Sequence, residues 1–201
     1  MDAFLQFYIP IFYIVYILIA FALPTYRVWK TTGINPITFS KSDNAHDYIG
    51  GVFKVLLLAV FIEIGIQCFF PAIMHNYLLP MNYLNNPIFR VIGLVIIHLS
   101  CIWTIIAQYQ MNKSWRIGID EQNKTELVST GIFAYSRNPI FLGMLITLTG
   151  LFFISPNGLS FCILIVSFVI LQIQVRLEED FLIKIHGDIY RAYKKSTRRW
   201  L

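Results

Sequence analysis

Five apolar stretches, each close to twenty residues long, constrain the fold of this chain more than any other feature. They cover about residues 4–23, 49–70, 88–109, 133–154 and 158–176. A helix needs about 20 consecutive apolar residues to cross a bilayer. The sequence therefore predicts an all-α integral membrane protein with five transmembrane helices, forming a single membrane domain over residues 1–201.

Composition agrees with a membrane protein and argues against a nucleic-acid partner. Only 13% of the residues are charged, whereas a soluble domain carries about a quarter. The formal net charge is +5, but the basic residues lie beside the apolar segments, where anionic lipid headgroups explain them. The cysteines and histidines have no metal-like spacing, so no metal site is predicted.

The distribution of basic residues predicts the orientation. The N-terminus and segments 71–87 and 155–157 contain no Lys or Arg, and fifteen of the 16 basic residues fall on the opposite side. Basic residues favour the cytoplasmic side, so we expect the N-terminus outside and the C-terminus in the cytoplasm. The first segment has no basic residue before it, unlike a signal peptide, and is interpreted as a retained helix.

Two connections refine this topology. The last two apolar stretches are separated only by Ser-Pro-Asn-Gly, which predicts a tight antiparallel hairpin. Beyond the fifth stretch, apolar residues recur at helical spacing from Phe181 to Tyr193, with Lys184, Arg191 and Lys194 off that stripe. This pattern predicts a C-terminal amphipathic helix in the headgroup region.

Polar groups gather at one depth, the cytoplasmic ends of the third, fourth and fifth stretches. They occupy residues 110–132, 135–139 and 176–180, and the hairpin brings the last two groups to one membrane face. A simpler interpretation of the third group is a solvated helix end in which Arg176 pairs with Glu179 or Asp180. Deeper in the membrane, Glu63 is a candidate functional residue, or a protonated carboxyl partnered by His98.

Two motifs in this region resemble a known family. The run LVSTGIFAYSRNPIFLG over residues 127–143 resembles the first signature of the isoprenylcysteine carboxyl methyltransferase and phospholipid methyltransferase superfamily. The run RLEEDFLIKIHGDIYRAY over residues 176–193 resembles its second signature. Asn138 and Phe141 replace the usual His and Tyr. Together the motifs place the cofactor-binding half at about residues 110–201.

The resemblance implies an S-adenosylmethionine-dependent methyltransferase acting at the cytoplasmic membrane interface on a lipophilic acceptor, either an isoprenylcysteine-type carboxylate or a lipid. It also implies a set of cofactor-binding residues, namely Leu127, Val128, Gly131, Tyr135, Arg137, Asn138, Pro139, Phe141, Gly143 and Glu178. Arg176 and Glu179 are the candidate catalytic residues. Arg176 suits a carboxylate acceptor, and Glu179 suits an amine that must lose a proton.

Two other functions compete with this hypothesis. A sterol-type membrane reductase that uses NADPH has a similar first signature, although its tail differs from Arg176-Leu177-Glu178-Glu179. A non-catalytic membrane protein is the second alternative, and it would carry polar residues through the bilayer instead of gathering them at one face. The sequence leaves the methyl acceptor and the oligomeric state open.

Overall fold

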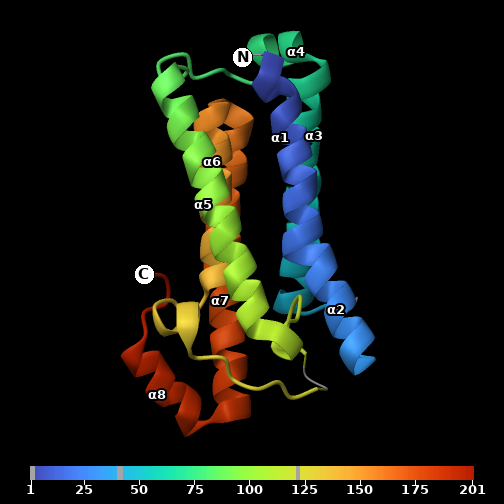
Figure 1. Ribbon diagram of the computed structural model, residues 1–201, viewed down its shortest axis with the longest axis vertical. Coiled ribbons are helices and arrows are strands. Elements are labelled where there is room, and N and C mark those ends of the chain that lie inside the picture. Colours follow the sequence, from blue (N-terminus) through green and yellow to red (C-terminus); the bar gives the residue numbers. More distant parts are fainter. Residues whose placement is uncertain (1–2, 40–42, 121–122) are drawn as a thin grey trace.

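Long helices lying side by side form the body of the protein (Figure 1). The computed structural model describes residues 3–39, 43–120 and 123–201. The helices are α1 (Ala3–Ile17), α2 (Leu23–Thr32), α3 (Ala45–Phe69), α4 (Pro71–Tyr77), α5 (Pro87–Met111), α6 (Pro139–Ile154), α7 (Gly158–His186) and α8 (Asp188–Ser196). A π turn at Leu18–Ala22 joins α1 to α2, so the chain is helical from residue 3 to residue 32.

The described helices confirm an all-helical membrane protein. Four of them are long and apolar enough to span a bilayer, namely Ala3–Thr32, Ala45–Phe69, Pro87–Ser114 and Gly158–His186. Many large apolar side chains point outward from these helices, for example Phe7, Phe61 and Ile102, each more than half exposed. The remaining apolar helix, α6, has 16 residues and a length of about 24 Å, shorter than a hydrocarbon core of about 30 Å.

Several predicted boundaries require correction. The first helix continues past residue 23 to Thr32. The fourth helix begins at Pro139 and not at residue 133, because a residue before proline disfavours the helical conformation; Gly131–Ala134 form a 3-10 turn instead. The fifth helix continues ten residues beyond 176, to His186. The amphipathic segment is therefore split at Gly187, where φ is +57°, into the end of α7 and the separate helix α8.

The missing N–H of Pro24 explains the π turn in the first helix. Pro24 has no N–H and cannot donate to the carbonyl of Ala20 four residues earlier. The Gln108 side chain on α5 donates to that carbonyl instead, with an Nε2–O distance of 2.7 Å. Gln108, one of the polar residues at membrane depth, thereby fixes α5 against the first helix.

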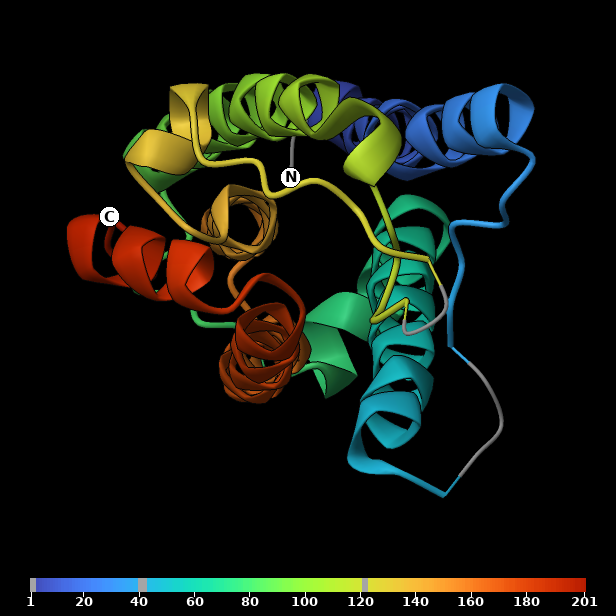
Figure 2. The ribbon, with the colours of Figure 1, turned by 90° about the horizontal axis from the view of Figure 1, so that it is seen from below.

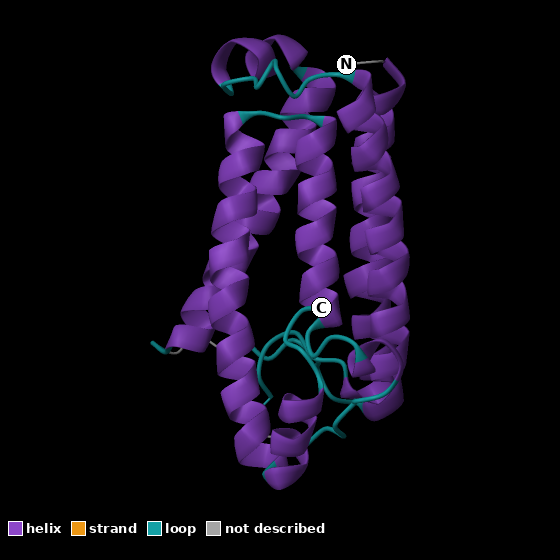
Figure 3. Cartoon of the chain, turned by 90° about the vertical axis from the view of Figure 1, so that its left-hand side faces the viewer, coloured by secondary structure: helices purple, strands orange, loops and turns teal. Residues whose placement is uncertain are grey.

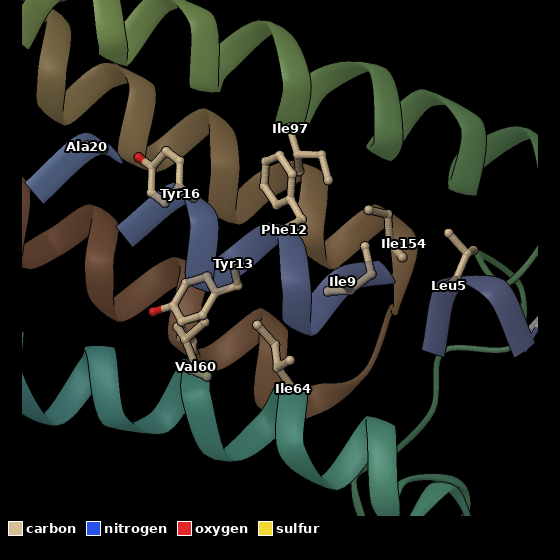
Figure 4. Close-up of a cluster of buried hydrophobic side chains, with 11 residues drawn as sticks. Leu5, Ile9, Phe12, Tyr13, Tyr16, Ala20, Val60, Ile64, Ile97 and Ile154 are labelled. Carbon is tan, nitrogen blue, oxygen red and sulfur yellow. The ribbon is translucent and has the colours of Figure 1, made fainter. Parts of the chain in front are cut away.

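The main hydrophobic core lies between α1 and its neighbours (Figure 4). Ile9, Phe12, Tyr13 and Tyr16 of α1 pack with residues of α3, α5, α6 and α7, and all are buried. Burial of these rings and aliphatic chains gives the first helix a fixed position against the α6–α7 hairpin.

Asn157 fastens the end of the bundle that carries the N-terminus and α4. Its Oδ1 accepts from the backbone N–H groups of Leu159 and Ser160, which caps α7. Its Nδ2 donates to Glu63 Oε1 of α3 over 2.8 Å. His98 is bonded to Tyr8 instead, so the proposed pairing of Glu63 with His98 is wrong, and Glu63 takes part in a hairpin anchor.

Replacing Asn157 with Ala should destabilise the protein by about 2–4 kcal/mol. The substitution removes a helix cap and leaves the buried Glu63 carboxyl short of a donor. Thermal unfolding in detergent measures the effect, with Asn82→Ala as control because Asn82 is exposed in the neighbouring loop. Equal melting temperatures for the two variants would contradict the anchor.

The opposite end of the bundle, called the cavity end here, carries residues 33–39, 112–138 and 188–201 among those described. Its loops gather beneath the helices (Figure 3). Seen from below, the connection from α5 to α6 crosses the end of the bundle, and α8 lies beside α7 (Figure 2). The polar groups that the sequence places at one depth therefore meet at this end.

Candidate active site

A cavity of about 290 Å³ opens at the cavity end. This volume is near the lower limit of roughly 300 Å³ for small-molecule sites. Its wall combines the first helix, α3, residues 114–118 and 125–128, the start of α6, the end of α7 and the inner face of α8. Seven of the predicted site residues line it, namely Leu127, Val128, Arg137, Asn138, Pro139, Phe141 and Glu178.

Glu178 and Gln174 put hydrogen-bond acceptors on the α7 side of this cavity. One helical turn separates them, and Gln174 Nε2 donates to Glu178 Oε1 over 2.8 Å. Gln174 is 1% exposed, and its Oε1 has no hydrogen-bond partner among the described residues. A buried acceptor without a donor is costly, so this wall fits a ligand that brings N–H or O–H groups.

Another part of the wall is apolar and aromatic. Trp115 is 5% exposed and lies 6.3 Å from the ring of Phe21, centroid to centroid. Phe133, Leu127 and Val128 extend the same surface. Flat apolar side chains of this kind suit a planar heterocycle, whereas the acceptors of α7 suit its polar substituents.

Glu179, the neighbour of Glu178, faces away from the cavity and is 1% exposed. Its carboxylate oxygens lie 2.8 Å from Arg137 Nη2, 2.9 Å from Arg199 Nη2 and 3.1 Å from Lys194 Nζ. The hydrogen bond to Glu179 raises the pKa of the Arg199 guanidinium. One buried carboxylate therefore joins α7 to the start of α6 and to the C-terminal segment.

The C-terminal segment closes one side of the cavity. Tyr190 and Tyr193 of α8 line the wall. The Tyr193 hydroxyl donates to the carbonyl of Phe133 over 2.6 Å, and burial raises the pKa of that hydroxyl to about 12. Tyr193 is therefore a neutral donor at physiological pH.

The other predicted site residues lie outside this wall. Arg176 is exposed and donates to the Gln172 side chain on its own helix. Tyr135 is 71% exposed. Gly131 adopts φ +63° against the side chain of Gln110, and Gly143 permits close packing against Thr104. In the described structure these residues shape the surroundings of the cavity.

Sequence reasoning missed Trp115 as a wall residue and missed Gln174 entirely. The sequence analysis placed Trp115 only as part of the polar stretch 110–132 and gave it no role in the site. Gln174 carried a usable signal, since a polar residue one turn before Glu178 lies on the same helix face. Tyr190 and Tyr193 were visible in the second motif, but their direction depends on the break at Gly187.

The region that builds this site matches a known family. The phospholipid methyltransferase family model matches residues 88–189, from the start of α5 to the start of α8. The chain belongs to the phospholipid methyltransferase family. No curated protein matches it with a significant score.

Family membership settles the class of reaction. The protein is an S-adenosylmethionine-dependent methyltransferase with a lipid acceptor. It is also a multi-pass membrane protein. The reductase and the non-catalytic alternatives are therefore set aside.

Proposed function

We propose that the 290 Å³ cavity binds S-adenosylmethionine and that methyl transfer to the lipid acceptor takes place at its membrane-facing side. The observation that carries this proposal is the meeting of both family motifs in one wall. Residues 127–141 supply one part of that wall, and Glu178 supplies a carboxylate to it. When bound, the cofactor supplies an activated methyl group, so the main tasks of the protein are placement and exclusion of water.

Within this proposal, Glu178 and Gln174 accept hydrogen bonds from the ammonium or ribose groups of the cofactor. Glu178 also contributes negative charge that favours a bound cation. Trp115, Phe133, Leu127 and Val128 would hold the adenine ring. Arg176 and Glu179 lie outside this wall, so the proposed cofactor contacts do not include them.

We propose a phospholipid amine as the acceptor because of the family match, and a second, smaller cavity suits the chain of such a lipid. It has about 50 Å³ and lies deeper in the bundle, between α1, α3, α6 and α7. It shares Ile17, Phe21, Phe53, Leu57 and Met144 with the first cavity. Its lining is almost wholly apolar. This suits a lipid chain that extends into the bundle from a headgroup held near the cofactor.

We further propose that α6 also crosses the membrane, as the fourth of five crossings in chain order, and that the cavity end faces the cytoplasm. The N-terminus and the α6–α7 turn lie together at the other end (Figure 1). An even number of crossings between them puts both on the same side of the membrane, as this assignment requires. Fifteen of the 16 basic residues fall in segments assigned to the cytoplasmic side, which supports this orientation. The cofactor would then arrive directly from the cytosol.

Binding of S-adenosylmethionine to purified protein tests the proposal. Calorimetry should give saturable binding to the wild type, and Glu178→Gln should weaken it by about tenfold or more, since a hydrogen bond to a charged group contributes about 1.5–3 kcal/mol. Asp180→Asn is the matched control, because Asp180 is exposed two residues along the same helix. Binding that is equal in all three proteins would remove Glu178 from the site, and binding of NADPH alone would refute the cofactor assignment.

A further inference from the structure

The C-terminal segment, residues 188–199, is joined to the first family motif by a series of hydrogen bonds. The Arg137 N–H donates to the carbonyl of Arg198 over 2.9 Å. The Arg137 guanidinium also donates to the carbonyls of Lys194 and Thr197. Asn138 Nδ2 donates to the carbonyl of Arg199 over 3.1 Å. These bonds run to backbone groups, so they hold the path of the segment whatever its side chains are.

The Glu179 carboxylate completes this attachment from the opposite side. It receives Arg137 from the motif and Lys194 and Arg199 from the segment, all within 3.1 Å. The Arg137 side chain therefore contacts both Glu179 and the segment. Because the carboxylate is 1% exposed, these charge-assisted bonds are weakly screened by solvent.

We propose that Glu179, Arg137 and Asn138 form a clasp that positions the C-terminal segment over the cofactor cavity. The clasp thereby holds Tyr190 and Tyr193 in the wall of the cavity. Glu179 is a positioning residue that acts through this segment, and Glu178 is its cavity-facing neighbour with a different task. The effect on cofactor binding rests on the proposed function, whereas the attachment itself is a property of the ligand-free protein.

The clasp also gives the Asn138 side chain a role. An amide side chain has two N–H donors, and one of them reaches the carbonyl of Arg199. No titration of this side chain is needed for that bond. Asn138 thus holds the segment equally well at any pH at which the protein is folded.

Hydrogen exchange measured by mass spectrometry on the ligand-free protein in detergent tests the clasp directly. Glu179→Gln should speed exchange in peptides that cover residues 188–199 and 135–138, while Glu178→Gln should leave them at the wild-type rate. Arg199→Gln is the milder variant, because its side chain is 28% exposed and Arg137 and Lys194 still pair with Glu179. Arg199→Lys, which keeps a cation near Glu179, should restore most of the protection.

S-adenosylmethionine binding to the same proteins supplies the second readout. Glu179→Gln and Arg199→Gln should bind about tenfold more weakly, with faster release, and Arg199→Lys should recover affinity together with protection. Wild-type exchange in the segment of Glu179→Gln would overturn the clasp, whether or not the cofactor binds. Faster exchange in the segment of Glu179→Gln, combined with no binding of S-adenosylmethionine to the wild type, would instead overturn the proposed function and leave the attachment standing.

Discussion

Replacing Gly150 with Leu is expected to abolish the folded protein or to lower its stability by more than about 3 kcal/mol. Gly150 of α6 faces Gly93 of α5 at the most extensive helix–helix interface in the described structure. A Cβ atom at Gly150 would lie 2.6 Å from Ile97 Cγ2 and 2.9 Å from the Gly93 carbonyl oxygen. Since one of these neighbours is backbone, the two helices would have to separate.

Gly65→Leu is the matched control for this prediction. Gly65 also lies inside a long helix, α3, but an added Cβ there meets nothing within 4 Å. We expect Gly65→Leu to fold and to elute from size-exclusion chromatography as the wild type does. Thermal unfolding then compares the two variants, and similar stability for both would show that the close approach of α5 and α6 is not required.

The same interface shows a limit of the sequence analysis. No clear small-residue face was visible, because Gly93 and Gly150 lie on different helices and become partners only when α5 and α6 pack. Within membranes, small residues permit such close contacts. Ser100 and Thr147 add a hydrogen bond of 2.8 Å across this interface. The partnership of two residues 57 positions apart depends on tertiary structure that a periodic pattern does not encode.

Local chemistry was easier to predict. Four of the five predicted apolar stretches form helices long enough to span a bilayer, and Ser-Pro-Asn-Gly forms the predicted turn between α6 and α7. Glu178 was expected in the site and lines the cavity. Glu178 and Glu179 could not be told apart in the sequence, however, because the rotation of α7 decides which carboxylate faces the cavity and which faces the C-terminal segment.

Helix geometry explains why the neighbouring carboxylates Glu178 and Glu179 have different roles. Successive residues of a helix point about 100° apart, so one helix end can serve two surfaces at once. Glu178 contributes a carboxylate to a cavity where the Gln174 amide oxygen has no partner in the described part of the chain. Glu179 is saturated by three cations and is suited to holding structure in place.

The second large effect is expected from Leu57→Trp, which should lower the rate of lipid methylation by about 100-fold while leaving S-adenosylmethionine binding within about threefold. Leu57 of α3 lines both the large cavity and the deeper apolar one. An indole there would intrude where the two cavities share their lining. A displaced acceptor chain would withdraw its headgroup from the methyl group, and misplacement by about 1 Å costs about 100-fold in rate.

Leu58→Trp provides the control, because it introduces the same side chain one position along α3. Leu58 is 58% exposed on the lipid-facing side of the helix and lines neither of the two cavities. Transfer of labelled methyl groups from S-adenosylmethionine to a phospholipid amine in mixed micelles gives the rate, and calorimetry gives the cofactor affinity. Loss of methylation in both variants would point to a general effect of the indole on α3, and unchanged methylation in Leu57→Trp would place the acceptor chain elsewhere. A rate lost only in Leu57→Trp, with cofactor binding retained, would assign the deeper cavity to the lipid and separate its path from that of the cofactor.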